Sequence, residues 1–175
     1  MITTTKPVLL ALSVVLWALI FALEVEGDLI TDIGNKKYLI KTDKKLNWYQ
    51  ANHACTVAGM SLASIESETE QTNLKNYLFK QNHLNDGFWL SGNNLADATV
   101  YTWLSSGNKL DYTNWASSQP SPTPDYCVYT DANLKWTTEA CGGTTPVTKY
   151  FICSRPHVPD CGITGRCKVN RNFFF

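Results

Sequence analysis

The 175-residue chain has no excess of charge of either sign, because 15 lysine and arginine residues balance 15 aspartate and glutamate residues. Charged residues make up 17% of the chain, below the quarter that is usual for globular proteins. A chain without net positive charge lacks the main source of affinity for a polyphosphate backbone. The composition therefore argues against a nucleic-acid partner and predicts one folded domain with short appendages.

The sequence also lacks the motifs of common hydrolases and of zinc sites. It contains no Gly-x-Ser-x-Gly turn and no His-Glu-x-x-His helix, which would supply an activated nucleophile or a catalytic metal. His53, His83 and His157 are scattered, and none stands at ligand spacing from a pair of cysteines. We therefore predict a binding protein without catalytic residues rather than an enzyme. The Asn-x-Ser/Thr sequon is absent as well, so no asparagine-linked glycan is expected.

One long apolar run is present at 7–23, directly after Lys6. Such a run, followed by small residues, is typical of a secretory leader, here residues 1–27 with Asp28 as the first mature residue. Cleavage after Ala22 is the alternative cut. The rival interpretation is an uncleaved anchor, because the run is at the lower edge of what spans a bilayer. The segment between the apolar run and the first predicted strand is too short to serve as the stalk of a membrane-anchored protein. We therefore predict a secreted, extracellular protein without a membrane span in its mature chain.

The cysteines all follow this leader and would enter the oxidising secretory route: Cys55, Cys127, Cys141, Cys153, Cys161 and Cys167. Their even number predicts three disulfides. Cysteine spacing alone leaves many pairings open, so the connectivity needs further information.

The periodicity of apolar residues predicts two helices followed by strands. Asn47 is typical of a helix cap, and apolar residues recur at helical spacing over 48–58 until Gly59. Ser67 and Glu70 have the spacing of a capping box before a second apolar stripe. Runs rich in aromatic and β-branched residues predict strands at 37–41, 88–90, 100–103, 126–130 and 149–153. This order predicts an α+β fold with short antiparallel strands and long loops.

Four motifs in this order resemble those of the C-type lectin domain. The first helix has the pattern Trp48-x-x-Ala51-x-x-x-Cys55-x-x-x-Gly59-x-x-Leu62-x-x-Ile65. The segment Phe88-Trp-Leu-Ser-Gly-Asn93 is similar to the family's central strand as secreted insect lectins have it. Asn114-Trp115 leads to Gln119-Pro120, as in the family's ligand loop. The closing motif is matched in spacing by Cys127, Trp136, Cys141 and Cys153.

The resemblance covers about residues 36–155, with an N-terminal segment at 28–35 and a tail at 156–175 outside the pattern. It implies a disulfide-stapled short form of the domain, with the pairs Cys55–Cys153 and Cys127–Cys141. That leaves the pair Cys161–Cys167 to form a knuckle in the tail. The core is expected to contain Trp48, Trp89 and Trp103. The border of the ligand site is expected to contain Trp115 and Trp136.

In this family a calcium ion joins the protein to a sugar, held by side-chain oxygens around a cis-proline, by an acid and by an Asn-Asp pair. The resemblance places Gln119 and Asp125 at two ligand positions, next to a cis Pro120. The remaining positions carry only hydroxyl groups, which are weak substitutes: Ser121, Thr137 and Thr138. Because calcium takes about six to eight oxygen ligands and gains affinity with each carboxylate, we expect weak calcium binding or none.

The resemblance thus implies a protein that binds carbohydrate, through a weakened calcium site or through a polar, aromatic-lined surface, and the leader implies that this protein is secreted. The candidate ligand-binding residues are Trp115, Gln119, Ser121, Asp125, Tyr126, Thr137 and Thr138. The Gln119-Pro120 pair is similar to the galactose-preferring version of the motif. The alternative is a metal-independent domain that binds an extracellular protein, with the proline-braced loop 119–125 as a rigid contact surface.

Overall fold

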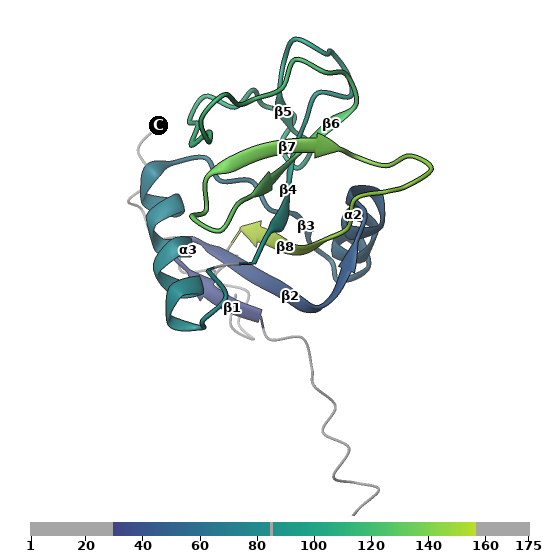
Figure 1. Ribbon diagram of the computed structural model, residues 1–175. Coiled ribbons are helices and arrows are strands. Elements are labelled where there is room, and N and C mark those ends of the chain that lie inside the picture. Colours follow the sequence, from purple (N-terminus) through teal and green to yellow (C-terminus); the bar gives the residue numbers. More distant parts are fainter. Residues whose placement is uncertain (1–29, 85, 157–175) are drawn as a thin grey trace, which may run out of the picture.

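The computed structural model describes residues 30–84 and 86–156 of the chain (Figure 1). Its helices are α2 (Trp48–Val57) and α3 (Glu68–Lys80). Its strands are β1 (Ile30–Ile33), β2 (Lys36–Leu46), β3 (Ser61–Leu62), β4 (Phe88–Asn93), β5 (Thr102–Trp103), β6 (Tyr126–Thr130), β7 (Trp136–Ala140) and β8 (Lys149–Pro156). The expected leader at 1–27 and the expected knuckle of Cys161 and Cys167 lie outside the described residues.

The strands form one sheet in the order β1-β2-β8-β4-β6-β7, with β3 beside β8 and β5 beside β4. The predicted α+β class, with two helices and short strands, is confirmed. β4 and β8 run parallel, so the sheet is mixed, whereas the sequence predicted antiparallel pairing. The sheet also includes β1, which precedes the segment that carries the family pattern and pairs with β2 over its whole length.

Side-chain caps fix where both helices begin. The Asn47 side chain accepts a hydrogen bond from the Gln50 N–H (2.9 Å), and the Gln50 side chain accepts one from the Asn47 N–H (3.2 Å), which confirms the predicted cap. Ser67 caps α3 by accepting from the Glu70 N–H (3.2 Å). α2 ends before Gly59, whose φ of +68° lies in the left-handed region that favours glycine.

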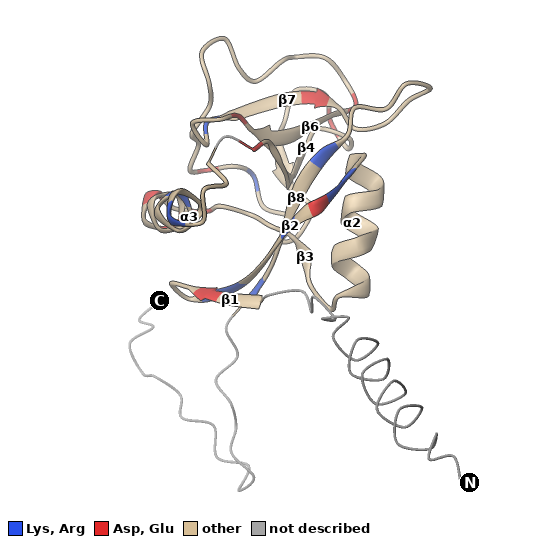
Figure 2. Ribbon diagram, turned by 60° about the horizontal axis from the view of Figure 1, so that its bottom comes forward, with Lys and Arg blue, Asp and Glu red and all other residues tan. Residues whose placement is uncertain are grey.

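Alternating residues of β2 and β8 face two separate cores, one on each side of the sheet. Tyr38 and Ile152 pack with the apolar stripe of α3, whereas Leu39 and Phe151 pack with the apolar face of α2. Both views place α2 and α3 on opposite sides of these strands (Figures 1 and 2). Figure 2 also shows residues of both charge signs along β2 and α3, in agreement with the neutral composition.

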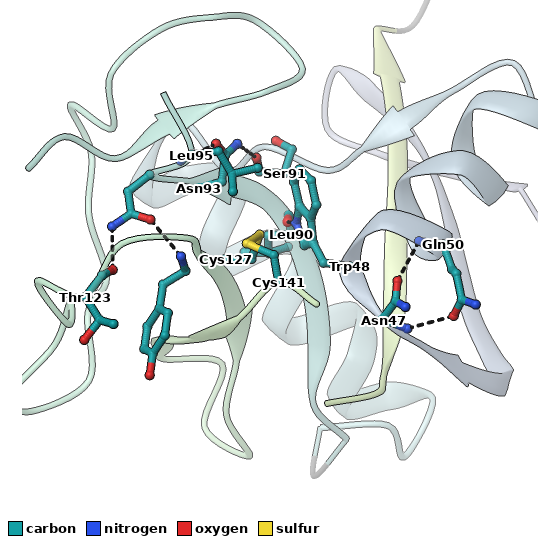
Figure 3. Close-up of a disulfide and its surroundings, with 12 residues drawn as sticks. Asn47, Trp48, Gln50, Leu90, Ser91, Asn93, Leu95, Thr123, Cys127 and Cys141 are labelled. Carbon is teal, nitrogen blue, oxygen red and sulfur yellow. Dashed lines mark hydrogen bonds between the residues drawn. A yellow bond between two sulfur atoms is a disulfide. The ribbon is translucent and has the colours of Figure 1, made fainter. Parts of the chain in front are cut away.

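Disulfides join the framework at two points. The Cys55–Cys153 bond links α2 to β8, and the Cys127–Cys141 bond links β6 to the end of β7 (Figure 3). Both pairs are those that the resemblance implied. Trp48 is 2% exposed and donates from its indole N–H to the Leu90 carbonyl (2.8 Å), which ties α2 to the central strand β4. Within 30–84 and 86–156, neither helix has the length and apolar character that crossing a membrane requires.

Candidate ligand-binding loop

The candidate site is built on the β6–β7 hairpin and on the chain segment that leads into it. β6 and β7 pair in continuous antiparallel register. The segment 114–116 lies along β7, because the Trp136 N–H donates to the Asn114 carbonyl (2.8 Å) and the Trp136 carbonyl accepts from the Ala116 N–H (2.7 Å). These bonds bring together two stretches, 114–126 and 136–140, that are separate in the sequence.

Gln119 and Thr138, both predicted site residues, bind each other directly. The Gln119-Pro120 peptide bond is cis, as the resemblance implied. The Gln119 side-chain oxygen accepts from the Thr138 N–H (3.1 Å) and from the Thr138 hydroxyl (2.7 Å). The same hydroxyl accepts from the Ser121 N–H (3.1 Å), and Thr138 is 6% exposed. An amide oxygen has two lone pairs, so the protein itself occupies the acceptor that a metal would use.

The loop that follows Pro120 is held by further hydrogen bonds. The Ser121 carbonyl accepts from the Tyr101 hydroxyl (3.0 Å), and the Ser121 hydroxyl donates to the Thr123 hydroxyl (2.9 Å). Burial raises the pKa of the Tyr101 phenol, although its hydrogen bond with Thr138 acts in the opposite direction. Tyr101 is therefore a proton donor that fixes the loop at neutral pH.

Asp125 and Thr137 take no part in the contact between Gln119 and Thr138. Asp125 is exposed with a φ of +60°, and its carbonyl accepts from the Cys141 N–H (3.1 Å). Across the described residues its carboxylate forms no hydrogen bond or ion pair, so it is available to a ligand. Thr137 lies opposite Tyr129 in register, and neighbouring residues of a strand face opposite sides, so it does not join Thr138 at Gln119.

This donor set does not fit calcium. The loop offers one exposed carboxylate, from Asp125, and one amide oxygen that is already bonded twice, from Gln119. Calcium prefers about six to eight oxygens, including several carboxylates. In the part of the chain that the structure describes, no group of three or more histidine, cysteine, aspartate or glutamate residues is placed to hold a metal ion.

Aromatic side chains form the wall beside the loop. Trp115, which is half-buried, lies edge-on to Tyr101 and to Trp136, with ring centroids 5.5 and 5.6 Å apart. Trp136 is fully buried and donates from its indole N–H to the Gln71 side chain (2.9 Å). Of these rings Trp115 is the one with substantial exposure, so it is the aromatic surface that a ligand can reach.

Tyr126 is anchored by Asn94, a residue that sequence reasoning missed. The Asn94 side chain accepts from the Tyr126 N–H (2.8 Å) and donates to the carbonyls of Thr123 (2.8 Å) and Ala98 (3.2 Å). Figure 3 shows Thr123 at the end of one of these bonds. Asn94 is 2% exposed and follows β4 directly, but the sequence shows only an asparagine after a predicted strand and does not reveal its burial.

Comparisons with known proteins agree on one family. The model of the lectin C-type domain matches residues 44–155. Over 134 residues the chain is 29% identical to the C-type lectin mosGCTL-7 of Aedes aegypti, covering 71% of this chain and 87% of that protein. Over 115 residues it is 29% identical to the galactose-specific lectin nattectin of Thalassophryne nattereri, covering 63% of this chain and 68% of that protein.

Among solved structures, a calcium-independent type II antifreeze protein has a TM-score of 0.60 at 23% identity, covering 73% of this chain and 91% of that one. At this identity the likeness establishes the fold alone. Fold and motifs together define a disulfide-linked binding domain of the α+β class. The chain belongs to the C-type lectin domain family, whose fold is that of a binding domain and not of an enzyme.

Proposed function

We propose that this protein is a secreted lectin that binds carbohydrate without a calcium bridge, with Trp115, Asp125 and Tyr126 as the residues that contact the sugar. The observation that carries the proposal is the pair of hydrogen bonds from Thr138 to the Gln119 side-chain oxygen. These bonds use the acceptor that would otherwise hold calcium, so a sugar must be bound by the protein's own groups.

The chemistry of the loop suits a sugar. The Asp125 carboxylate is exposed and accepts hydrogen bonds from sugar hydroxyls, while the exposed part of the Trp115 ring packs against the apolar face of a sugar ring. The loop is preorganised, because Tyr101 holds Ser121 and Asn94 holds Thr123. Preorganisation lowers the entropy cost of binding. A galactose-type ligand is the first candidate, since the Gln119-Pro120 pair and the likeness to a galactose-specific lectin both favour it.

A glycan array tests this proposal when it is probed in the presence of excess chelator. The expected result is glycan binding that persists with chelator and falls at least about tenfold in Asp125→Asn, which removes a charged acceptor. Asp111→Asn is the matched control, because Asp111 is an exposed carboxylate outside the loop. Binding that disappears with chelator would overturn the calcium-free mechanism, and equal effects of the two variants would move the site away from Asp125.

An extracellular protein is the second candidate ligand, favoured by the exposed prolines of the same loop. Pro120, Pro122 and Pro124 are all exposed, whereas the backbone between them is hydrogen-bonded to Tyr101 and Asn94. A rigid, exposed loop of this kind loses little conformational entropy when it binds a protein. An array without any glycan signal, together with capture of a defined extracellular protein that Pro122→Ala weakens, would favour this candidate.

Secretion is part of the proposal, with residues 1–27 as the leader, 28–35 as a short N-terminal segment, 36–155 as the domain and 156–175 as its tail. The disulfides Cys55–Cys153 and Cys127–Cys141 support an oxidising compartment. N-terminal sequencing of protein collected from the medium of secreting cells tests the leader. The expected first residue is Asp28, and retention of the apolar run in a membrane fraction would contradict secretion.

A further inference from the structure

A second surface with the features of a binding site lies between α2 and the strands β2 and β8. It is an open groove of about 520 Å³, within the range of about 300 to 1,000 Å³ that small-molecule sites occupy. Its floor is formed by Leu39 of β2 and Phe151 of β8, and its far wall by Ala54 of α2. None of its lining residues belongs to the loop around Gln119, so the groove is a separate site.

The groove exists because α2 presents small residues to the sheet at this point. Ala54 lies in the last turn of α2 and Ala58 directly follows the helix, and both line the groove where larger side chains would fill the space. The walls are fixed, because the Cys55–Cys153 disulfide joins α2 to β8 within the same region. Val57, at the edge of the groove, is 75% exposed and extends the apolar surface toward solvent.

The rim of the groove is basic. Lys41, Lys44 and His53 line it, and no acidic residue does. The nearest acid in sequence, Asp43, is paired with Lys41 at 3.2 Å. Lys44 is exposed and forms no ion pair with any residue in 30–84 or 86–156, so its charge is available to a ligand. The pairing of β2 with β8 shifts register between Lys41 and Leu46, so strict side-chain alternation does not hold where Lys44 joins the groove.

We propose that this groove binds the monomeric form of a single-chain carboxylate, that is, a medium- or long-chain fatty acid. The acyl chain lies on Leu39, Ala54 and Phe151, and the carboxylate is held by Lys44 at the rim. Charge complementarity favours this occupant over a neutral one. The apolar floor favours it over a free phosphate, which buries no apolar surface, and over a sugar, whose hydroxyl groups would lose water there without hydrogen-bond partners. This proposal is independent of the glycan site.

Titration calorimetry with sodium dodecanoate, kept below its micellar concentration, tests the proposal. We expect binding of one dodecanoate per protein, with affinity about tenfold lower in Lys44→Gln because a charge-assisted contact is lost. Dodecan-1-ol should bind more weakly than dodecanoate and be insensitive to Lys44→Gln. Lys75→Gln, at an exposed position of α3, is the matched control and should leave both affinities unchanged.

Filling the groove gives a second, independent test. Ala54→Leu keeps a good helix former and occupies the space of the acyl chain, so dodecanoate binding should be lost. Ala58→Leu, at an exposed position beside it, serves if Ala54→Leu does not fold. The thermal midpoint of each variant without ligand shows whether it is folded. Unchanged dodecanoate affinity in a folded filled variant overturns the proposal, as does absence of binding to the unmodified protein.

The remaining outcome is that the groove binds the surface of a membrane and not a monomeric fatty acid. Vesicles of phosphatidylcholine and phosphatidylserine, sedimented with the protein, distinguish the two sources of an acyl chain with an anionic group. The proposal expects no sedimentation that depends on Lys44 and Ala54. Vesicle binding that Lys44→Gln or Ala54→Leu abolishes, without binding of monomeric dodecanoate, would contradict it.

Discussion

At the residue scale, Thr138 fixes the loop around Gln119. Its hydroxyl and N–H both bond to Gln119, and the hydroxyl also satisfies the Ser121 N–H. These three hydrogen bonds thus join the segment 119–121 directly to β7. The resemblance identified these positions as ligand positions, but it could not show that they bind each other, because that contact depends on tertiary placement.

Restoring a side chain that can ligate calcium should therefore restore calcium binding. The variant Thr138→Asp removes the hydroxyl's bond to the Gln119 oxygen, leaving only that of the backbone N–H, and adds a carboxylate beside it. At ten times its Kd, calcium should stabilise this variant by about 1.4 kcal/mol, seen as a rise of a few degrees in the thermal midpoint. The control is Thr138→Asn, which lacks the charge. An equal response of both variants would show that the position is not a metal ligand.

Tyr38 carries a pH-dependent part of the stability. It is fully buried, its hydroxyl bonds to the Glu70 carboxylate, and Glu70 also pairs with Lys36 at 2.7 Å. Burial, followed by the nearby Glu70 charge, raises the pKa of the Tyr38 phenol far above its ordinary value near 10. A raised folded pKa gives stability that is complete below the unfolded value and is lost as pH rises above it.

The free energy of unfolding should accordingly fall above about pH 10. Tyr38→Phe lacks the phenol, so its unfolding free energy should be lower at pH 8 but should decline less steeply above pH 10. Urea unfolding from pH 8 to pH 11 measures both curves. Parallel curves for the two proteins would show that Tyr38 ionisation does not contribute.

At the element scale, local signals predicted the helices well and the short strands poorly. Asn47 and Ser67 cap the helices as predicted, because capping depends on neighbours a few residues away. The predicted capping box at Ser67 is only half formed, since the Glu70 side chain accepts from the Glu66 N–H (2.9 Å) and not from that of Ser67. β1, β3 and β7 were missed. β3 is two residues long, and β7 is held by partners on both sides, β6 and the segment at Trp115, that no local pattern reveals.

The groove beside α2 was missed for a similar reason. Ala54 and Ala58 fit any helix, and nothing in the sequence indicates that the sheet leaves space opposite them. Tyr101 and Asn94 were missed because each acts through backbone groups of a distant loop. The residues that the sequence did predict lie in recognisable motifs, such as Gln119, Asp125 and the framework cysteines.

The packing of β4 against β5 and β6 requires a glycine at position 92. A Cβ built there would lie 2.7 Å from a methyl group of Val128 and 3.2 Å from the Trp103 ring. Gly92→Ala should therefore destabilise the protein by about 1 to 3 kcal/mol, because neither neighbour can move freely in the core.

A double-mutant cycle checks this assignment. Val128→Ala removes the nearest methyl group, so the pair Gly92→Ala with Val128→Ala should cost less than the sum of the single changes. Guanidinium unfolding of the four proteins measures the coupling. Strict additivity would mean that Gly92 is required for a reason other than this contact.

At the scale of the whole molecule, the two disulfides close loops of very different length. Cys55 and Cys153 are 98 residues apart, whereas Cys127 and Cys141 are 14 apart. The loop-entropy model gives about 4 to 5 kcal/mol for the long loop and about 3 kcal/mol for the short one. The Cys55–Cys153 bond also joins α2 to β8, which both line the groove.

Removing each bond should therefore have unequal effects. Cys55→Ala with Cys153→Ala should lower the unfolding free energy by about 1 to 2 kcal/mol more than Cys127→Ala with Cys141→Ala. Chemical unfolding of the two double variants under identical conditions compares them. A greater loss from the hairpin bond would mean that native contacts, and not chain entropy, dominate.

The central claim is that the loop around Gln119 works without calcium, and the thermal midpoint of the oxidised protein tests it most directly. The measurement compares excess chelator with calcium up to about 10 mM, a level that fills even weak extracellular sites. We predict the same midpoint in both, because no native-state calcium site adds stability. A saturable rise with calcium that Asp125→Ala abolishes would contradict the account and would place a metal ion at the loop.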